Sequence, residues 1–327
     1  MLDRLREPWS DQRAERALGA LACLVLVLIA LMIVFVAIRA WPSFQHNGLS
    51  WFTGKGDVDE EIARQVNSGA KPTAADYALG AWPLIWATIL TTGLAVLIGL
   101  AFSVLAAIFI VEFSPGGLRR VVVPVVRLLA AVPSVIYGLI GILVLVPFVN
   151  DHFVGEGRKQ SVQYVINLSG TGLLVSVVIL TVMITPIMIA IIVDALYAVP
   201  RGWKEGAVAL GVNRWRAMWT VSVRAARPAI IAGAVLACAR ALGEAIMLSM
   251  VSGSKGFAPN PADGLTFIFE PLRPLASTIV EDAESLNAPA VRATVYSFAL
   301  LLLFSAFVLS IGAWLAKQPM KKYGIRV

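Results

Sequence analysis

Charged side chains are scarce in this sequence. Only 14% of its 327 residues are Asp, Glu, Lys or Arg, whereas 58% are hydrophobic, and the mean hydropathy is +0.80. Because soluble domains carry about one-quarter charged residues, a water-soluble fold is excluded. Each of the runs that lack charge entirely could cross a bilayer core, which needs about 20 mainly apolar residues in a helix. These runs are 17–38, 77–111, 128–150, 160–193 and 293–316.

Cysteine and nucleotide-binding glycine motifs are also missing or rare. The two cysteines, Cys23 and Cys238, fall in apolar segments, so we expect packing residues rather than a disulfide framework or a metal cluster. No Gly-x-x-x-x-Gly-Lys-Ser/Thr sequence occurs. The chain therefore has no P-loop with which to hold nucleotide phosphates.

A sixth apolar stretch, Pro228 to Val251, is interrupted only by Arg240 and Glu244 and still suits one crossing. The sequence therefore predicts an all-α, polytopic transmembrane helix bundle. A cleaved signal peptide is not expected, because the first apolar run follows a charged stretch and is long enough to stay as an anchor. The predicted spans are 18–39, 82–111, 121–149, 171–195, 227–251 and 293–316.

The distribution of charge predicts the orientation. Basic residues gather at the N-terminus, at Arg119–Arg120, over 196–227 and at the C-terminus, while the alternate loops are acidic. Positively charged short loops stay in the cytoplasm, so both termini are predicted to be cytoplasmic in a multi-pass plasma membrane protein. The net charge of +7 is spread over membrane-flanking positions, and nucleic-acid binding is therefore not expected.

The resulting division of the chain has a central core with flanking segments. We expect the 40–78 loop to form an ordered extracytoplasmic cap, because it holds Trp41, Trp51 and several turn glycines. Prolines in the external 252–292 segment argue against a continuous helix there. The predicted parts are a cytoplasmic tail 1–17, the first transmembrane helix 18–39, the extracytoplasmic loop 40–78, a five-helix core 79–316 with a cytoplasmic loop 196–226, and a cytoplasmic tail 317–327.

The 196–226 loop has the pattern of a helix, a turn and a second helix. Pro200 is placed to start a short helix, Glu205 falls in its first turns, and Gly211 is a plausible C-terminal stop. Asn213 can cap the next helix, which runs towards the fifth span. The sequence thus predicts a compact knob projecting into the cytoplasm.

The knob resembles a known signature. The run Glu205-Gly206-Ala207-Val208-Ala209-Leu210-Gly211 is similar to the EAA motif of bacterial ABC importer permeases, in which nine residues separate the glycine from Ile-x-Leu-Pro. After Gly211, nine residues lead to Val221-Ser222-Val223-Arg224, and the departures from the motif are Gly206 in place of an Ala and Arg224 in place of the Pro. The resemblance implies that Glu205, Gly206, Ala207 and Gly211 couple the permease to ATPase subunits. The alternative is an amphipathic loop with a capping Glu, but its place between spans four and five favours coupling.

Charges inside spans are costly and so mark candidate functional residues. Arg240 and Glu244 are four residues apart, so we expect them to lie on one helix face and to form an ion pair that lowers the cost of burying both charges. Arg240 could also bind an anion, since guanidinium matches phosphate oxygens. A purely structural ion pair is the alternative. Arg127 lies near the start of its span, where snorkelling to the interface explains it.

Several short sequences resemble PstC-type phosphate permeases over residues 75–316. They are Arg240-Ala241-Leu242-Gly243-Glu244, Ala131-Val132-Pro133-Ser134-Val135-Ile136-Tyr137-Gly138, the set Tyr77, Gly80, Pro83 and Thr88, and Leu275 to Glu281. The resemblance implies a type I ABC importer permease fold and a translocation path for inorganic phosphate at Arg240, Glu244, Pro133, Ser134 and Tyr137. Alternatively, Pro133 merely kinks a helix with Ser134 satisfying its backbone, and Tyr137 only packs.

The same resemblance implies partners and leaves two alternatives open. The implied partners are a second, PstA-like permease, two PstB-like ATPase subunits that bind ATP and Mg²⁺, and an extracytoplasmic PstS-like phosphate-binding protein; no cofactor is expected on this chain. One alternative is an ABC permease for sulfate, molybdate or another small solute. The other is an ATP-independent secondary transporter, which predicts an inverted repeat that the sequence does not clearly show.

Overall fold

The computed structural model describes residues 8–54, 56–155 and 168–321. Six helical segments in these residues are long and apolar enough to cross a membrane, which confirms the predicted number of spans. Within the described ranges there is no β-strand, and the one isolated bridge joins Gly253 to Leu272. The segments are Arg13–Asn47, Ala74–Phe113, Ser134–His152, Leu173–Ala198, Arg214–Leu242 and Pro289–Leu315.

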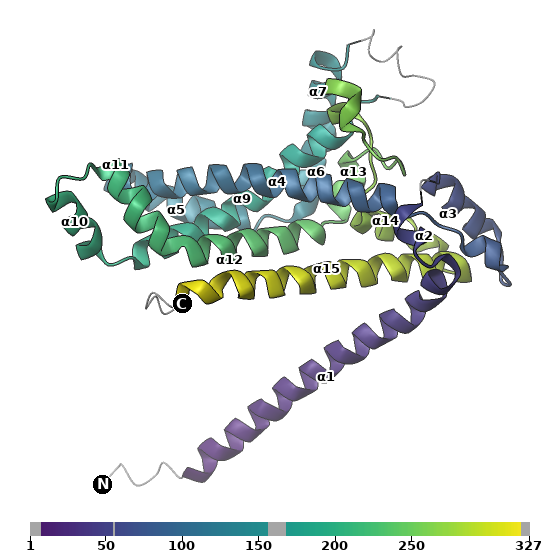
Figure 1. Ribbon diagram of the computed structural model, residues 1–327, viewed down its shortest axis with the longest axis horizontal. Helices are drawn as coiled ribbons and strands as arrows, with labels where there is room; N and C mark the ends of the chain where they lie inside the picture. The colour runs from purple at the N-terminus through teal and green to yellow at the C-terminus, as the bar shows by residue number, and fades with distance from the viewer. Residues whose placement is uncertain (1–7, 55, 156–167, 322–327) are drawn as a thin grey trace.

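The centre of the bundle consists of α4 (Trp82–Ile108), α9 (Leu173–Ala198), α5 (Gly116–Ala130) and α12 (Val223–Leu242), which pack along one another (Figure 1). Helix α9 is the most buried span, and its Met183, Ile184 and Met188 are fully enclosed. A Cβ on Gly99 would lie 2.8 Å from the terminal methyl of Met188. The glycine therefore lets α4 approach α9 closely, and a larger residue there would force the methionine to move.

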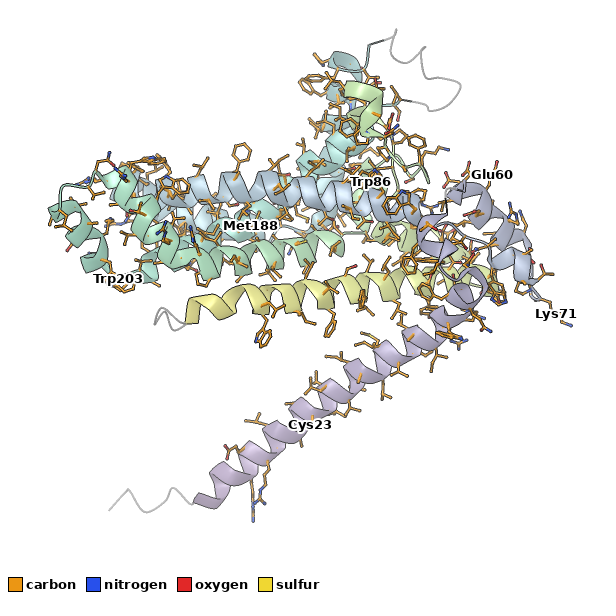
Figure 2. The ribbon with its side chains drawn as sticks, viewed as in Figure 1. Cys23, Glu60, Lys71, Trp86, Met188 and Trp203 are labelled. Carbon is orange, nitrogen blue, oxygen red and sulfur yellow. The ribbon has the colours of Figure 1, made fainter. Side chains whose placement is uncertain are left out.

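Two helices lie at the edge of this bundle. α1 (Pro8–Asn47) packs mainly on α15 (Pro289–Lys321) and otherwise diverges from the bundle (Figure 1). Only 6% of the apolar part of α1 that could span a membrane is buried within the chain. Cys23, labelled in Figure 2, is exposed, so the expectation that Cys23 is a packing residue of this chain is wrong. The helix is also continuous across the predicted boundaries at 17 and 39.

A second, smaller core lies at one end of the bundle. It joins α2 (Ser50–Thr53) and α3 (Val58–Asn67) to η1 (Ala74–Tyr77), α14 (Leu275–Glu281) and the start of α15. Trp51, Leu84 and Phe298 are fully buried in it. The 40–78 loop is thus ordered as expected, with Trp51 as its packing centre, whereas Trp41 is exposed.

Two predicted spans are interrupted, so the expectation of continuous helices over 121–149 and 227–251 is wrong. α5 ends at Ala130, and the chain restarts as α6 (Ser134–Ile140), η3 (Gly141–Leu145) and α7 (Val146–His152). α12 ends at Leu242 and is followed by α13 (Ile246–Val251). Pro133 has no N–H to donate to a continuing helix, and Gly243 weakens the helix at the second interruption.

The remaining elements connect the spans. The turns η2 (Phe109–Phe113) and η4 (Met218–Ser222) are π-helical, and α10 (Arg201–Ala209) and α11 (Arg214–Ala217) follow α9 at the end of the bundle opposite α3 (Figure 1). The 3₁₀ helices η5 (Pro261–Phe269) and η6 (Ala283–Ser285) flank α14. The 252–292 segment is therefore not a continuous helix, as its prolines predict.

Candidate functional site

The two helix interruptions face one another through the short helices that follow them. α6 packs against α13, and the chain from α6 to α7 rises steeply away from the axis of α4, α9 and α12 (Figure 1). A Cβ on Gly138 would lie 2.8 Å from Met250 Sδ, and one on Gly141 would lie 2.6 Å from Val251 Cγ1. These glycines let the two helices touch, and the predicted translocation residues all belong to the interruptions or their flanking helices.

The first interruption carries Pro133, Ser134 and Tyr137. Pro133 caps α6, and the buried Tyr137 donates its hydroxyl to the carbonyl oxygen of Leu129 at 3.0 Å. That carbonyl belongs to the last turn of α5, where carbonyl oxygens lack the N–H donors of a following helical turn, and it also accepts a hydrogen bond from Val132 N at 3.3 Å. The tyrosine therefore bridges the break, which is the backbone role that we considered for Ser134 under the kink alternative.

The second interruption separates Arg240 from Glu244. Because α12 ends at Leu242, the two residues are not on one helix, and the ion pairs of the described residues do not include one between them. Arg240 is exposed in the last turn of α12, while Glu244 is 8% exposed and accepts a hydrogen bond from Met247 N at 3.4 Å, at the start of α13.

This arrangement stabilises both charges without pairing them. A cation is favoured at the C-terminal end of a helix and an anion at the N-terminal end, because the helix dipole places the opposite partial charge there. The Arg240 guanidinium has no ion-pair partner among the described residues and so remains available to a ligand. Interrupted backbone at membrane depth occurs where protein buries it or where it lines a water-filled cavity.

Arg127 has a partner that sequence reasoning did not identify. Its Nη2 lies 2.8 Å from Oδ1 of Asp194 on α9, although both side chains are more than half exposed on the isolated chain. The pair ties α5 to α9. Snorkelling alone therefore does not explain Arg127.

At the far end of the bundle, α10 carries the predicted coupling residues. It begins after Pro200 and ends before Gly211, whose φ of +84° is the left-handed conformation that terminates helices. Asn213 caps α11 by accepting a hydrogen bond from Arg216 N at 2.7 Å. The helix–turn–helix prediction is thus confirmed, including its start, stop and cap.

The surface of α10 is open. None of its residues is buried; Glu205 and Gly206 are exposed, Ala207 is partly exposed, and the Trp203 and Val208 side chains keep 52% and 40% of their surface. Trp203 lies at the opposite end of the molecule from Glu60 and Lys71 (Figure 2). An exposed helix with apolar side chains and small residues has the features of a contact surface for another protein.

A cavity of about 650 Å³ lies behind α10. Its polar wall includes the side chains of Glu112, Arg119, Arg201, Lys204 and Arg214. Lys204 Nζ donates to Glu112 Oε1 at 2.6 Å and to Oε2 at 2.7 Å. This contact fastens α10 to the turn that follows α4. Spacing along the chain does not indicate it, because the two residues are 92 positions apart.

The strongest charge cluster lies at the other end, around Arg273. Its guanidinium forms ion pairs with Glu281 at 2.8 Å, Asp282 at 2.9 Å and Asp59 at 3.4 Å, and the arginine side chain is 8% exposed. Ser254 donates to Glu281, and Gly256 N donates to Asp59. We refer to Arg273, Asp59, Glu281 and Asp282 as the Arg273 cluster.

Burial dominates the electrostatics of the Arg273 cluster. It raises the pKa of Glu281 and Asp282 above the ordinary values, and Arg273 only partly offsets this effect. Burial alone would lower the pKa of Arg273, but Asp282, Glu281 and Asp59 together raise it. Oδ2 of Asp282 is buried without a hydrogen-bond partner. The cluster thus carries more negative than positive groups in a poorly hydrated place.

The Arg273 cluster joins three separated segments, and sequence reasoning missed it. Two features of the sequence were compatible with such a cluster: the acidic character of the 40–78 and 252–292 segments, and a single arginine between prolines 271 and 274. Spacing along the chain does not indicate that Arg273 pairs with Asp59, however, because more than 200 residues separate them. Among the described residues, no group of three or more His, Cys, Asp and Glu is arranged to hold a metal ion.

The residues of the second-span motif hold the same end together. Gly80 packs directly on Gly54, because a Cβ on Gly80 would lie 2.8 Å from the Gly54 carbonyl carbon. Thr88 Oγ1 accepts a hydrogen bond from Leu275 N at 2.9 Å. Pro83 is buried in the first turn of α4, and Tyr77 stacks on His46 with ring centroids 4.5 Å apart. These positions are structural in this chain.

Comparison with known proteins gives consistent results. Residues 99–318 match the family described as binding-protein-dependent transport system inner membrane component. A probable phosphate transport system permease protein PstC of Methanocaldococcus jannaschii is 34% identical over 72% of this chain and 74% of its own length. The phosphate transport system permease protein PstC of Pasteurella multocida is 29% identical over 93% of this chain and 90% of its own.

A solved structure shows the same fold. It is the bacterial alginate ABC transporter in complex with an alginate pentasaccharide-bound periplasmic protein. The match has a TM-score of 0.53 at 15% sequence identity and covers 96% of this chain and 98% of that one. At this identity the likeness concerns the fold, which is the type I importer permease architecture that the sequence motifs imply.

Proposed function

The chain belongs to the family of binding-protein-dependent transport system inner membrane components, and from this premise we propose that it is the permease subunit that carries inorganic phosphate through an ATP-driven importer. The observation that carries the choice of cargo is its similarity to phosphate permeases over most of its length. An exposed guanidinium at a helix interruption suits an oxyanion.

The translocation path in this proposal runs past the two helix interruptions. Arg240 attracts phosphate, and its position at the C-terminal end of α12 stabilises the charge while no anion is bound. Glu244, held at the start of α13, opposes anion entry on its side and so limits how tightly phosphate binds. Weak binding is an advantage in a transport path, since the ion must also leave.

The interruptions also supply the parts that can move. Pro133 and Tyr137 define a joint between α5 and α6, and the second joint lies between α12 and α13. Because α6 and α13 pack on one another, a change at one joint is transmitted to the other. Ser134 is partly exposed in the first turn of α6 and offers a hydroxyl to a passing anion.

The partners follow from what the chain lacks. It has no P-loop, so the energy comes from two PstB-like ATPase subunits that hold ATP and Mg²⁺, and α10 is the surface they contact through Glu205, Gly206, Ala207 and Gly211. A second, PstA-like permease completes the path, and a PstS-like binding protein delivers phosphate from outside. The ends of α1 and α15 point toward the α10 end (Figure 1), in keeping with a cytoplasmic location for both termini.

The test is uptake by the purified four-component complex in proteoliposomes. ATP is supplied on the side of the membrane that α10 faces, and the binding protein with labelled phosphate is supplied on the opposite side. Labelled phosphate should then accumulate on the ATP side, and excess sulfate or molybdate should not compete with it. Uptake that is competed by sulfate or molybdate would assign the cargo to another oxyanion. Uptake without ATP or without the ATPase subunits would overturn the importer assignment as a whole.

A further inference from the structure

The ion pair between Lys204 and Glu112 joins two parts of the chain that have different mechanical roles. Lys204 lies in α10, and Glu112 lies in η2, the turn that ends the second span. Both carboxylate oxygens accept from the one ammonium group, at 2.6 and 2.7 Å. The side chains are 29% and 15% exposed, so the pair is better shielded than a surface salt bridge and correspondingly stronger.

The turn that carries Glu112 is held rigidly. Arg119 donates hydrogen bonds to the carbonyl oxygens of Ile110 at 3.0 Å, Val111 at 2.6 Å and Ser114 at 3.3 Å. Its guanidinium also lies over the Tyr197 ring, 5.8 Å from the centroid, in the last turn of α9. Displacement of Glu112 must therefore displace the end of α4 rather than a loose side chain.

The other end of α4 is fastened to the segments around Pro259 and Leu275. Thr88 Oγ1 accepts from Leu275 N at 2.9 Å, at the first residue of α14, and Trp86 Nε1 donates to the carbonyl oxygen of Pro259 at 2.9 Å. Trp86 and Trp203 lie far apart along the bundle (Figure 2). α4 therefore connects the α10 end to the segment that precedes α14 through a single continuous element.

We propose that the Lys204–Glu112 ion pair is the link through which α10 moves α4, and that α4 carries this movement to the external segment around Pro259 and Leu275. The inference rests on the proposed function and adds to it a route and a pair of positioning residues. Neither residue touches the cargo. The loop between α9 and α10 is the competing route, and it contains no comparable polar contact between described residues.

A double-mutant cycle tests the link. The variants are Lys204→Met, Glu112→Gln and both together, measured as phosphate transported per ATP hydrolysed by the assembled complex in proteoliposomes. Each single substitution should lower this ratio roughly fivefold or more, and the double variant should be no worse than either, because the pair acts as a unit. A purely structural pair would instead reduce the amount of assembled complex and leave the ratio unchanged.

Two further variants serve as controls. Arg120→Met removes an exposed positive charge beside Arg119 and should leave the ratio at the wild-type value, while Lys204→Arg keeps the charge and should retain most of it. If the Lys204→Met variant does not assemble into the complex, the ratio is measured on the isosteric Glu112→Gln variant alone. Normal ratios in the single variants, or losses that multiply in the double variant, would overturn the link; a wild-type complex that transports no phosphate would instead overturn the proposed function.

Discussion

Arg240 and Glu244 illustrate how local geometry decides what a charged residue does. Four residues apart on a helix they would neutralise each other, and the arginine would be a weak ligand. The helix end at Leu242 separates them, and each charge is stabilised by the helix end it occupies instead of by the other. An arginine without a carboxylate partner among the residues that the structure describes can exchange water for an anion at a much lower cost than one already paired.

Replacing Arg240 should therefore impair transport more than folding. We expect Arg240→Gln to lower the initial rate of phosphate uptake by about tenfold or more, since a charge-assisted contact contributes about 1.5–3 kcal/mol. The matched control is Arg227→Gln, which removes an exposed charge from the start of the same helix and should leave uptake unchanged. Wild-type uptake by an assembled Arg240→Gln complex would remove this residue from the path.

Arg273 represents the opposite case, because its charge stabilises the fold. Its guanidinium neutralises three carboxylates, which come from α3 and from the end of α14, in a poorly hydrated layer. Arg273→Met should destabilise the layer formed by α3, α14 and the segment between Pro271 and Pro274 by about 3 kcal/mol, near the lower end for breaking a buried pair because Asp59 stays partly exposed. Thermal unfolding in detergent provides the measurement, and an unchanged transition would show that the Arg273 cluster contributes little.

The raised pKa values of Glu281 and Asp282 predict how this layer responds to pH. A carboxyl whose folded-state pKa exceeds its unfolded value contributes stability below the unfolded pKa and loses it as the pH rises through the folded one. The layer should therefore exchange its amide hydrogens more slowly at mildly acidic than at neutral pH, after correction for intrinsic exchange.

Matched variants isolate the groups responsible for this pH response. Asp282→Asn should reduce the difference in exchange over 57–67 and 272–285, and Glu60→Gln, which removes an exposed carboxylate from α3, should not. Equal exchange at both pH values in the wild-type protein would contradict the sign that we assign.

At the scale of elements, the interrupted spans matter most. A continuous membrane helix satisfies its own backbone and gives a rigid rod, whereas the breaks at 131–133 and 243–245 free backbone groups. Tyr137 donates a hydrogen bond to one of them, the Leu129 carbonyl, in addition to the one from Val132 N. The packing of α6 on α13 then makes two separate breaks into one structural unit, which is the feature that a hinged gate requires.

α10 and the turn that follows it offer a contrast between two glycines. A Cβ on Gly206 would meet nothing within 4 Å, and its backbone is helical, so Gly206→Ala should stabilise α10 by about 0.5–1 kcal/mol. Gly211 also has open space, but its φ of +84° is strained for a side chain, so Gly211→Ala should destabilise the end of the helix by about 1–2 kcal/mol.

ATPase activity stimulated by the binding protein provides the measurement for both glycine variants. We expect Gly206→Ala to retain it and Gly211→Ala to lose a large part of it. Since Gly206→Ala restores the residue usual in the EAA motif, a loss of activity in that variant would indicate that this complex requires the departure from the motif.

At the scale of the whole molecule, the chain has two polar ends and an apolar middle. The Arg273 cluster and the small core around Trp51 stabilise one end, and the Lys204–Glu112 contact stabilises the other. α4 spans the distance between them. The most apolar parts of α1 and α15 are only 6% buried, although the start of α15 enters the small core through Phe298. Their exposed faces remain available to lipid or to a second permease.

The sequence alone determined the membrane class, the number of spans and the helix–turn–helix knob, because these depend on local composition, on hydropathy over about 20 residues and on capping residues such as Pro200, Gly211 and Asn213. It also indicated the residues at both breaks. It did not place the breaks themselves, since Pro133 and Gly243 are compatible with kinked but continuous helices, and only the packing of Gly138 and Gly141 against α13 makes the interrupted form compact.

The pairings of Arg273 and Lys204 were decided entirely by the tertiary structure. Their partners lie up to 214 residues away in the chain, and no spacing rule relates them. An ion pair of this kind forms when helix packing brings two chain segments together and removes water from between them, so its existence depends on the fold of the whole chain.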